Sequence, residues 1–192
     1  MLLQTRCRTI AALSAFLVLA SAGCMTEAET LRQNVMRQVE RADRDMEEAD
    51  AFEVIDHLGV QTVPYLCEAI VDPRRSPRQV FWITTALSLL RDTRAIPALV
   101  RIADACPVAD VTDEVIKDTL GAKMISLDAQ RAISKILFPG ETGRFGEYYA
   151  TFEDPFPLHT LAVQRNYYTN LNKWYRQWRA TYDEKRCQAT KP

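Results

Sequence analysis

The residue with the most specific chemical signal in this sequence is Cys24, which closes an apolar stretch near the N-terminus. Arg6 and Arg8 precede the stretch, and residues 10–22 carry no charge. A stretch of this length is shorter than the roughly 20 residues of a membrane-spanning helix. It matches the apolar segment of a secretory signal peptide, about 7–15 residues long, and the small residues after it are typical of a cleavage site. A cysteine directly after such a site narrows the interpretation further.

The segment SAGC at residues 21–24 resembles the lipobox of bacterial lipoproteins, usually Leu-Ala-Gly-Cys, with Ser21 standing where leucine is usual. The resemblance implies that residues 1–23 are removed, that the Cys24 sulfur receives a diacylglycerol, and that its new amine is acylated. Several acyl chains give stable membrane attachment. Because Met25 follows, rather than Asp, the resemblance also implies the periplasmic side of the outer membrane, if the source is a Gram-negative bacterium. An ordinary signal peptide with a chance cysteine is the alternative.

Three further cysteines remain after such processing: Cys67, Cys106 and Cys187. This is an odd number for an oxidising compartment. The sequence is compatible with two states: one disulfide plus one free thiol, or three reduced thiols. The spacing of the cysteines does not decide between these states. The absence of a CxxC motif gives a redox or zinc role little support.

Catalytic and metal-binding patterns have little basis in this sequence. Of the two histidines, His57 shares a helix face with Glu53, but no third ligand stands at a spacing such as HExxH. His159 follows a proline in an irregular segment. No GxSxG, SxxK or glycine-rich phosphate motif is present. We therefore expect no enzyme activity, no catalytic residue, no metal and no cofactor.

The elements that would position any site are predicted to be helical throughout. Glycine is scarce, with six residues, and no long stretch alternates apolar and polar residues. Residues 27–58 have an apolar residue every three or four positions, which predicts one helix or two with a break near residue 50. Thr26 or Thr30 could cap its start. Residues 24–50 are thus expected to form a tether and a first helix.

A repeated pattern follows in residues 51–138. Pro64 and Pro97 each stand where a helix would begin, 33 residues apart, and Leu66 corresponds to Leu99. A third start is predicted at residues 128–138. An insertion at 107–126 separates it from the second unit and contains a short helix near DEVIKDTL. A self-similar unit of two helices at this period indicates a solenoid.

The stretch ALSLLRDTRAIPALVRIA, at residues 86–103, resembles HEAT repeats of the short HEAT-like type. The resemblance implies an all-α fold, a short α-solenoid of stacked helical hairpins with a concave surface suited to a protein or peptide partner. A generic helical bundle with a coincidental proline match is the alternative.

Residues 139–192 are expected to form an irregular loop and a C-terminal helix rich in aromatic residues. One predicted stripe on this helix contains Tyr167, Leu171, Trp174, Trp178 and Tyr182, with Tyr168 and Tyr175 beside it. We expect the helix to cap the open end of the solenoid and to bury the stripe. Contact with a partner or with a membrane surface is the alternative.

Charge and compartment limit the function. The formal net charge is −1, which does not indicate nucleic acid as a partner. Residues 163–192 are basic and residues 26–56 acidic.

We expect a lipid-anchored envelope protein that serves as a scaffold or assembly factor for an unidentified envelope protein. A pilotin-like escort of an outer-membrane component and a HEAT-like lyase are the alternatives. The candidate contact residues are Arg94, Arg101, Arg176, Trp178 and Arg179.

Overall fold

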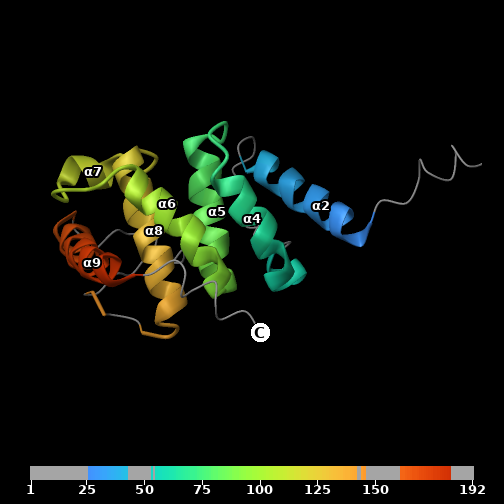
Figure 1. Cartoon of the computed structure of the whole chain (residues 1–192). Helices are drawn as coiled ribbons and strands as arrows, with labels where there is room; N and C mark the ends of the chain where they lie inside the picture. The colour runs from blue at the N-terminus through green and yellow to red at the C-terminus, as the bar shows by residue number, and fades with distance from the viewer. Residues whose placement is uncertain (1–25, 43–52, 54, 142–143, 146–160, 183–192) are drawn as a thin grey trace, which may run out of the picture. The chain divides into compact units, whose positions relative to one another are not determined.

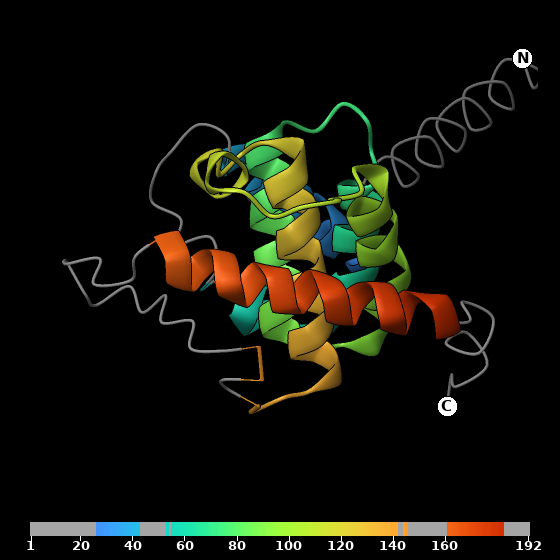
Figure 2. The same cartoon turned by 90° about the vertical axis from the view of Figure 1, so that its left-hand side faces the viewer.

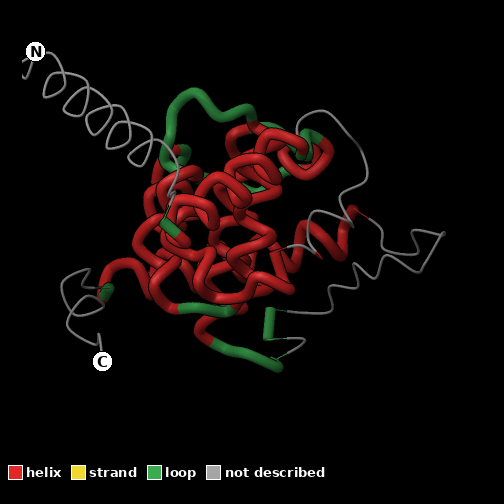
Figure 3. The backbone as a smooth tube through the Cα atoms, turned by 90° about the vertical axis from the view of Figure 1, so that its right-hand side faces the viewer, coloured by secondary structure: helices red, strands yellow, loops and turns green. Residues whose placement is uncertain are grey.

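The computed structural model of this chain describes residues 26–42, 53, 55–141, 144–145 and 161–182. These residues form helices and turns without a strand, which confirms the all-α prediction for this part of the chain (Figures 1 and 3). The chain divides into two units, Met1–Asn34 and Val35–Pro192. The packing between helices described below lies within the second unit.

The first described helix is α2, Glu27–Arg41. Its start is capped as predicted, since the Thr26 hydroxyl accepts a hydrogen bond of 3.2 Å from the Glu29 backbone N–H. Val35 and Val39, in its second half, belong to the predicted apolar face and are fully buried. The predicted break near residue 50 lies outside the described residues.

From Gly59 on, the described residues of the second unit form two short 3-10 helices and six α-helices. In chain order these are η1 (Gly59–Thr62), α4 (Val63–Ile70), α5 (Pro77–Leu90), η2 (Thr93–Ala95), α6 (Ile96–Ala105), α7 (Asp113–Lys117), α8 (Ala122–Leu137) and α9 (Leu161–Thr181).

Local sequence signals explain where these helices begin and end. Gly59 has a φ of 69°, the left-handed conformation that glycine adopts readily. Pro64 and Pro97 stand in the first turns of α4 and α6, where a missing N–H costs nothing. Ser76 and Gln79 form a reciprocal capping box at the start of α5.

Helix α8 is the centre of the second unit. It packs against four other helices, α5, α6, α7 and α9. Helix α4 packs against both α5 and α6. Figure 2 shows α9 lying across α8. Helix α8 begins at Ala122, inside the predicted insertion, and α7 coincides with the short helix predicted there.

Within the described ranges, no helix combines the length and apolar character needed to cross a bilayer. The predicted signal segment and Cys24 lie outside those ranges.

Candidate functional site

The candidate site is formed where α9 crosses the C-terminal end of α6 and the middle of α8. Helix α9 is amphipathic, and its buried residues follow helical spacing. They are Tyr167, Tyr168, Leu171, Asn172 and Tyr175.

The buried face of α9 differs from the predicted stripe. Tyr168 and Tyr175, expected beside the stripe, are almost fully buried at 1% and 4% exposure. Trp174 and Trp178, expected within it, are only partly buried. The aromatic residues cover two adjacent faces of the helix, so their spacing alone does not fix its rotation. The rotation of α9 is fixed by its hydrogen bonds and by its packing against α8.

Two polar side chains of α9 hold the loop that follows α6. The Asn172 Nδ2 donates to the Val108 carbonyl oxygen at 2.9 Å. The Arg176 Nη2 donates to the same oxygen and to the Ala109 carbonyl oxygen, at 3.1 Å for the latter. Arg176 therefore meets neutral carbonyl groups here, rather than a carboxylate.

One turn further along, α9 is fastened to α6 itself through Asp104. The Tyr175 hydroxyl donates to one carboxylate oxygen of Asp104 at 2.7 Å, and the Arg179 Nε donates to the other at 2.9 Å. Burial, and then the hydrogen bond to Asp104, raise the pKa of Tyr175 far above its usual value. The phenol therefore stays protonated and does not serve as a general base.

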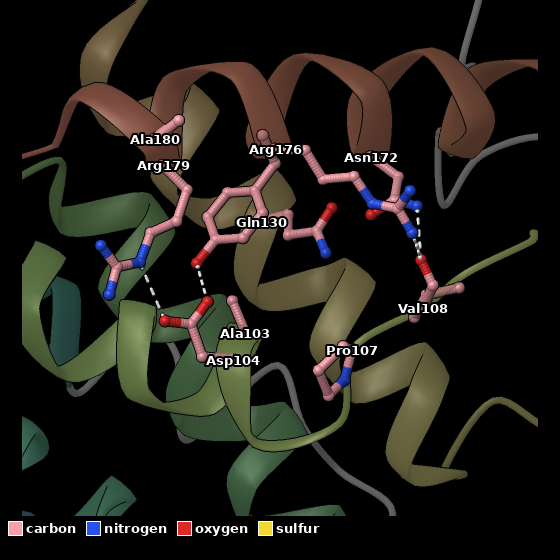
Figure 4. Close-up of a pocket in the computed structure, with 10 residues that line it drawn as sticks. Ala103, Asp104, Pro107, Val108, Gln130, Asn172, Arg176, Arg179 and Ala180 are labelled. Atoms are coloured by element: carbon pink, nitrogen blue, oxygen red, sulfur yellow. Dashed lines mark hydrogen bonds and ion pairs between the residues drawn. The ribbon is translucent and has the colours of Figure 1, made fainter.

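A cavity of about 320 Å³ lies between these contacts. Figure 4 shows its lining residues, with Gln130 placed between Arg179 on one side and Arg176 with Asn172 on the other. Gln130 comes from α8 and is 2% exposed, and its side-chain Oε1 has no hydrogen-bond partner. Apolar wall residues are contributed by the end of α6 and the loop after it: Ala103, Pro107 and Val108.

A half-buried aromatic ladder runs along the next face of α9, through Trp174, Trp178 and Tyr182. The two tryptophan rings are stacked with centroids 5.9 Å apart, and the Trp178 and Tyr182 centroids are 4.6 Å apart. The Arg179 guanidinium lies 5.6 Å from the Tyr182 ring centroid, within the range of a cation–π interaction.

The structure separates the five candidate contact residues into two groups. Arg176 and Arg179 line the cavity, and Trp178 belongs to the adjacent ladder. Arg94 does not line it: its Nη2 donates to the Val60 carbonyl oxygen at 3.0 Å, and it is paired with Asp92. Arg101 is exposed on α6 and also lies outside the cavity lining.

The sequence interpretation missed Gln130, Asn172 and Asp104. Each is an ordinary polar residue on an amphipathic helix, and no motif marks it. The hydrogen bonds that α9 makes to α6 and its following loop join residues 64 to 75 positions apart. Sequence spacing gives no signal over such separations.

The remaining titratable candidates lie elsewhere. His57 is exposed at the end of a short helical segment, and His159 and Cys187 are outside the described residues. Cys67 and Cys106 are both free thiols. Among the described residues, no group of three His, Cys, Asp or Glu side chains is arranged to hold a metal ion.

No family model, curated protein or solved structure matches this chain.

Proposed function

We propose that this protein is a lipid-anchored component of the cell envelope that acts as a protein-binding scaffold or assembly factor. The anchor is assigned to Cys24 on the sequence of residues 21–24 alone. Acyl chains at this position would keep the protein at the membrane surface. The helical unit would then present its binding surface to a protein in the envelope.

A HEAT-like solenoid is supported by the likeness of two consecutive segments. In each, a 3-10 turn leads into a helix with proline in its first turn, α4 in one case and α6 in the other. These helices pack against each other. Val63 and Leu66 in α4 and their counterparts Ile96 and Leu99 in α6 are all buried. Helical pairs that cannot bury their apolar faces alone are stabilised by such stacking.

The observation that carries the binding proposal is the basic and aromatic edge of α9. Helix α9 contains four basic residues and no acidic residue. Trp174, Trp178 and Tyr182 are each only partly buried. Tryptophan, tyrosine and arginine are the residues that most often dominate binding energy at interfaces. We expect a partner segment that is acidic and carries an apolar side chain to pack on the ladder.

Site-specific crosslinking in the source cells tests this proposal. A photoreactive p-benzoylphenylalanine replaces Trp178 in one variant, and Leu89 on α5, which is 52% exposed, in the matched control. We expect one dominant envelope protein to be crosslinked from position 178 and not from position 89. If that protein is an outer-membrane secretion component, the pilotin-like role is favoured. Equal products from both positions, or no specific product from position 178, contradict the proposal.

Intact mass of the mature protein tests the anchor separately. We expect a chain that begins at Cys24 and carries the added mass of a diacylglycerol and an acyl group. A Cys24→Ala variant should lack this mass and should leave the membrane fraction. An unmodified Cys24 at the mature N-terminus contradicts lipidation and leaves the binding proposal intact.

A further inference from the structure

The cavity beside α9 is walled mainly by apolar groups and opens to the surface. Figure 4 shows α9, with Ala180, along one side and Ala103 and Pro107 on the opposite side. Ala180 and Pro107 are exposed, so the cavity can be entered from solvent. An apolar cavity of roughly 150 Å³ is enough to bind a benzene molecule. The volume of about 320 Å³ therefore has room for one large aliphatic side chain.

The polar groups around this cavity are already paired within the protein. Asp104 accepts hydrogen bonds from Tyr175 and Arg179. The Val108 carbonyl oxygen accepts hydrogen bonds from two further side chains of α9. Gln130 is 2% exposed and offers almost no surface to an occupant. Since a buried polar group without a hydrogen bond is costly, these walls favour an apolar occupant over a polar one.

The edge of α9 that borders the cavity is positively charged. Lys173, Arg176 and Ala180 follow one another at helical spacing on this edge, and all three are exposed. Arg176 is bonded to neutral carbonyl oxygens, which do not offset its charge. Lys173 takes part in none of the ion pairs between described residues, and α9 contains no acidic residue. Charge complementarity therefore favours an acidic segment beside the apolar group.

Helix geometry sets the spacing between these two features. Lys173 and Ala180 are separated by two turns of α9, which corresponds to about 10 Å along the helix axis. An extended chain advances about 3.3 Å per residue. An acidic residue two or three positions from the apolar one therefore reaches the charged edge of α9.

We propose that this cavity receives one aliphatic side chain, of leucine or isoleucine size, from a partner protein that carries acidic residues two or three positions away. The aliphatic side chain packs against Ala103, Pro107 and Ala180, and the acidic residues lie beside Lys173. The inference rests on the proposed function and specifies how the partner is recognised, because it adds an anchor beside the aromatic ladder.

Synthetic peptides, titrated into the isotope-labelled full-length protein and followed by NMR, test this chemistry. The probes are acetyl-Glu-Glu-Leu-Glu-Glu-amide, the same peptide with alanine for leucine, and the same peptide with lysine for every glutamate. We expect the leucine peptide to bind at least about tenfold more tightly than the alanine peptide, because its larger side chain leaves water. The amide shifts should be largest at Ala103, Val108 and Ala180. Equal affinity for the leucine and alanine peptides, or tighter binding of the lysine peptide, overturns the inference.

Two other occupants are outcomes of the same measurement. The same shifts on raising the concentration of the protein alone identify a second copy of this chain. The same shifts on adding dihexanoyl-phosphatidylcholine below its micelle concentration, at lower concentrations than the leucine peptide requires, identify a lipid chain. Either outcome overturns the inference.

Ala180→Leu tests the position of the anchor, because a larger side chain there fills part of the cavity. It should weaken binding of the leucine peptide by about tenfold or more. Ala162→Leu is the matched control: Ala162 is exposed on the same helix and lies outside the cavity lining. It should change the affinity by less than about twofold. Both alanines are exposed, so neither substitution should lower the melting temperature, and equal affinities of the two variants overturn the assignment to this cavity.

Lys173→Gln tests the charge separately. It should weaken binding of the leucine peptide by about two- to fivefold at low ionic strength and by less at high salt. The preference for leucine over alanine should remain. Lys173→Arg keeps the charge and should keep the affinity. An affinity that Lys173→Gln leaves unchanged at low ionic strength removes the acidic residues from the proposed recognition.

These results separate the inference from the proposed function. A partner that crosslinks from position 178 equally well in the Ala180→Leu background, together with equal binding of the leucine and alanine peptides, leaves the scaffold proposal standing and removes the cavity anchor. Leucine-selective binding without a crosslinked partner supports the chemistry of the cavity and contradicts the scaffold proposal.

Discussion

Replacing Tyr168 with phenylalanine removes one hydroxyl group from a buried pair of polar side chains. The Tyr168 hydroxyl donates a hydrogen bond of 3.0 Å to Asp128, whose side chain is 8% exposed. Arg131 lies 3.7 Å from the same carboxylate oxygen. Burial is the largest influence on Asp128 and raises its pKa, while Arg131 and the tyrosine hydroxyl act in the opposite direction.

The size of the effect depends on the charge of Asp128. A hydrogen bond to a charged group contributes about 1.5–3 kcal/mol to stability, and one between neutral groups about 0.5–1.5 kcal/mol. The hydroxyl favours the ionised carboxylate, so its loss raises the pKa of Asp128 further. We therefore expect Tyr168→Phe to lower the free energy of unfolding by about 1.5–3 kcal/mol at pH 8 and by about 1 kcal/mol at pH 4.

The wild-type protein should show the corresponding pH dependence. The pKa of Asp128 is raised on folding, so protonated Asp128 contributes to the free energy of unfolding. This contribution is fully present below the unfolded pKa of about 4 and is lost as the pH rises through the folded pKa. Asp128→Asn should remove this part of the pH dependence. The loss should therefore appear as a steeper decline of wild-type stability than of Asp128→Asn stability above pH 4.

Urea unfolding, followed by circular dichroism at both pH values, measures these quantities. Tyr175→Phe is a matched control: it removes the same group from the same helix, but its acceptor Asp104 has a side chain that is 40% exposed. Water can replace the lost donor there, so we expect a loss below about 1 kcal/mol. A loss at Tyr168 no greater than at Tyr175, or one larger at pH 4 than at pH 8, would refute the reasoning.

Three further predictions follow from burial and hydrogen bonding. Leu99→Ala should lower the free energy of unfolding by about 2–5 kcal/mol because Leu99 is fully buried. The control Leu89→Ala, at a side chain that is 52% exposed, should change the free energy of unfolding by less than about 0.5 kcal/mol. Similar urea midpoints for the two variants would contradict this prediction. Ser126→Ala should cost about 1 kcal/mol in the same assay, since the buried Ser126 hydroxyl donates to the Ala103 carbonyl oxygen at 2.6 Å; an unchanged midpoint would argue against that bond. Burial raises the pKa of Cys67 to about 11, so its alkylation by iodoacetamide, followed by mass spectrometry, should keep increasing above pH 9, whereas a plateau near pH 9 would indicate an ordinary thiol.

Several helix boundaries could be predicted because neighbouring residues determine them. Gly59 follows a periodic segment and adopts the left-handed conformation that glycine, having no Cβ, reaches readily. Pro64 and Pro97 stand in the first turns of α4 and α6 because proline has a preset φ and lacks the N–H that a first turn leaves unpaired. Thr26 caps α2 for a similarly local reason. The start of α8 was not predicted, because Gly121 forms no side-chain cap there and the apolar residues after it gave no distinct signal.

The candidate site was predicted only in part. The sequence indicated that the basic and aromatic C-terminal helix was unusual, and Arg176 and Arg179 do line the cavity. Arg94, chosen as an exposed residue of a repeat's second helix, is instead held by Asp92 and by the Val60 carbonyl oxygen. An arginine in a sequence is a donor without an assigned acceptor, and its acceptor depends on which segment the fold brings near.

The sequence by itself determined that the described chain is helical and where proline-started helices recur, because spacing and backbone preference act over a few residues. It also determined that α9 is basic and aromatic. Tertiary structure alone decided which face of α9 is buried and that Gln130 of α8 borders a cavity without a partner. Burial and hydrogen-bond pairing depend on side chains that come from three separate helices, and no local pattern encodes their meeting.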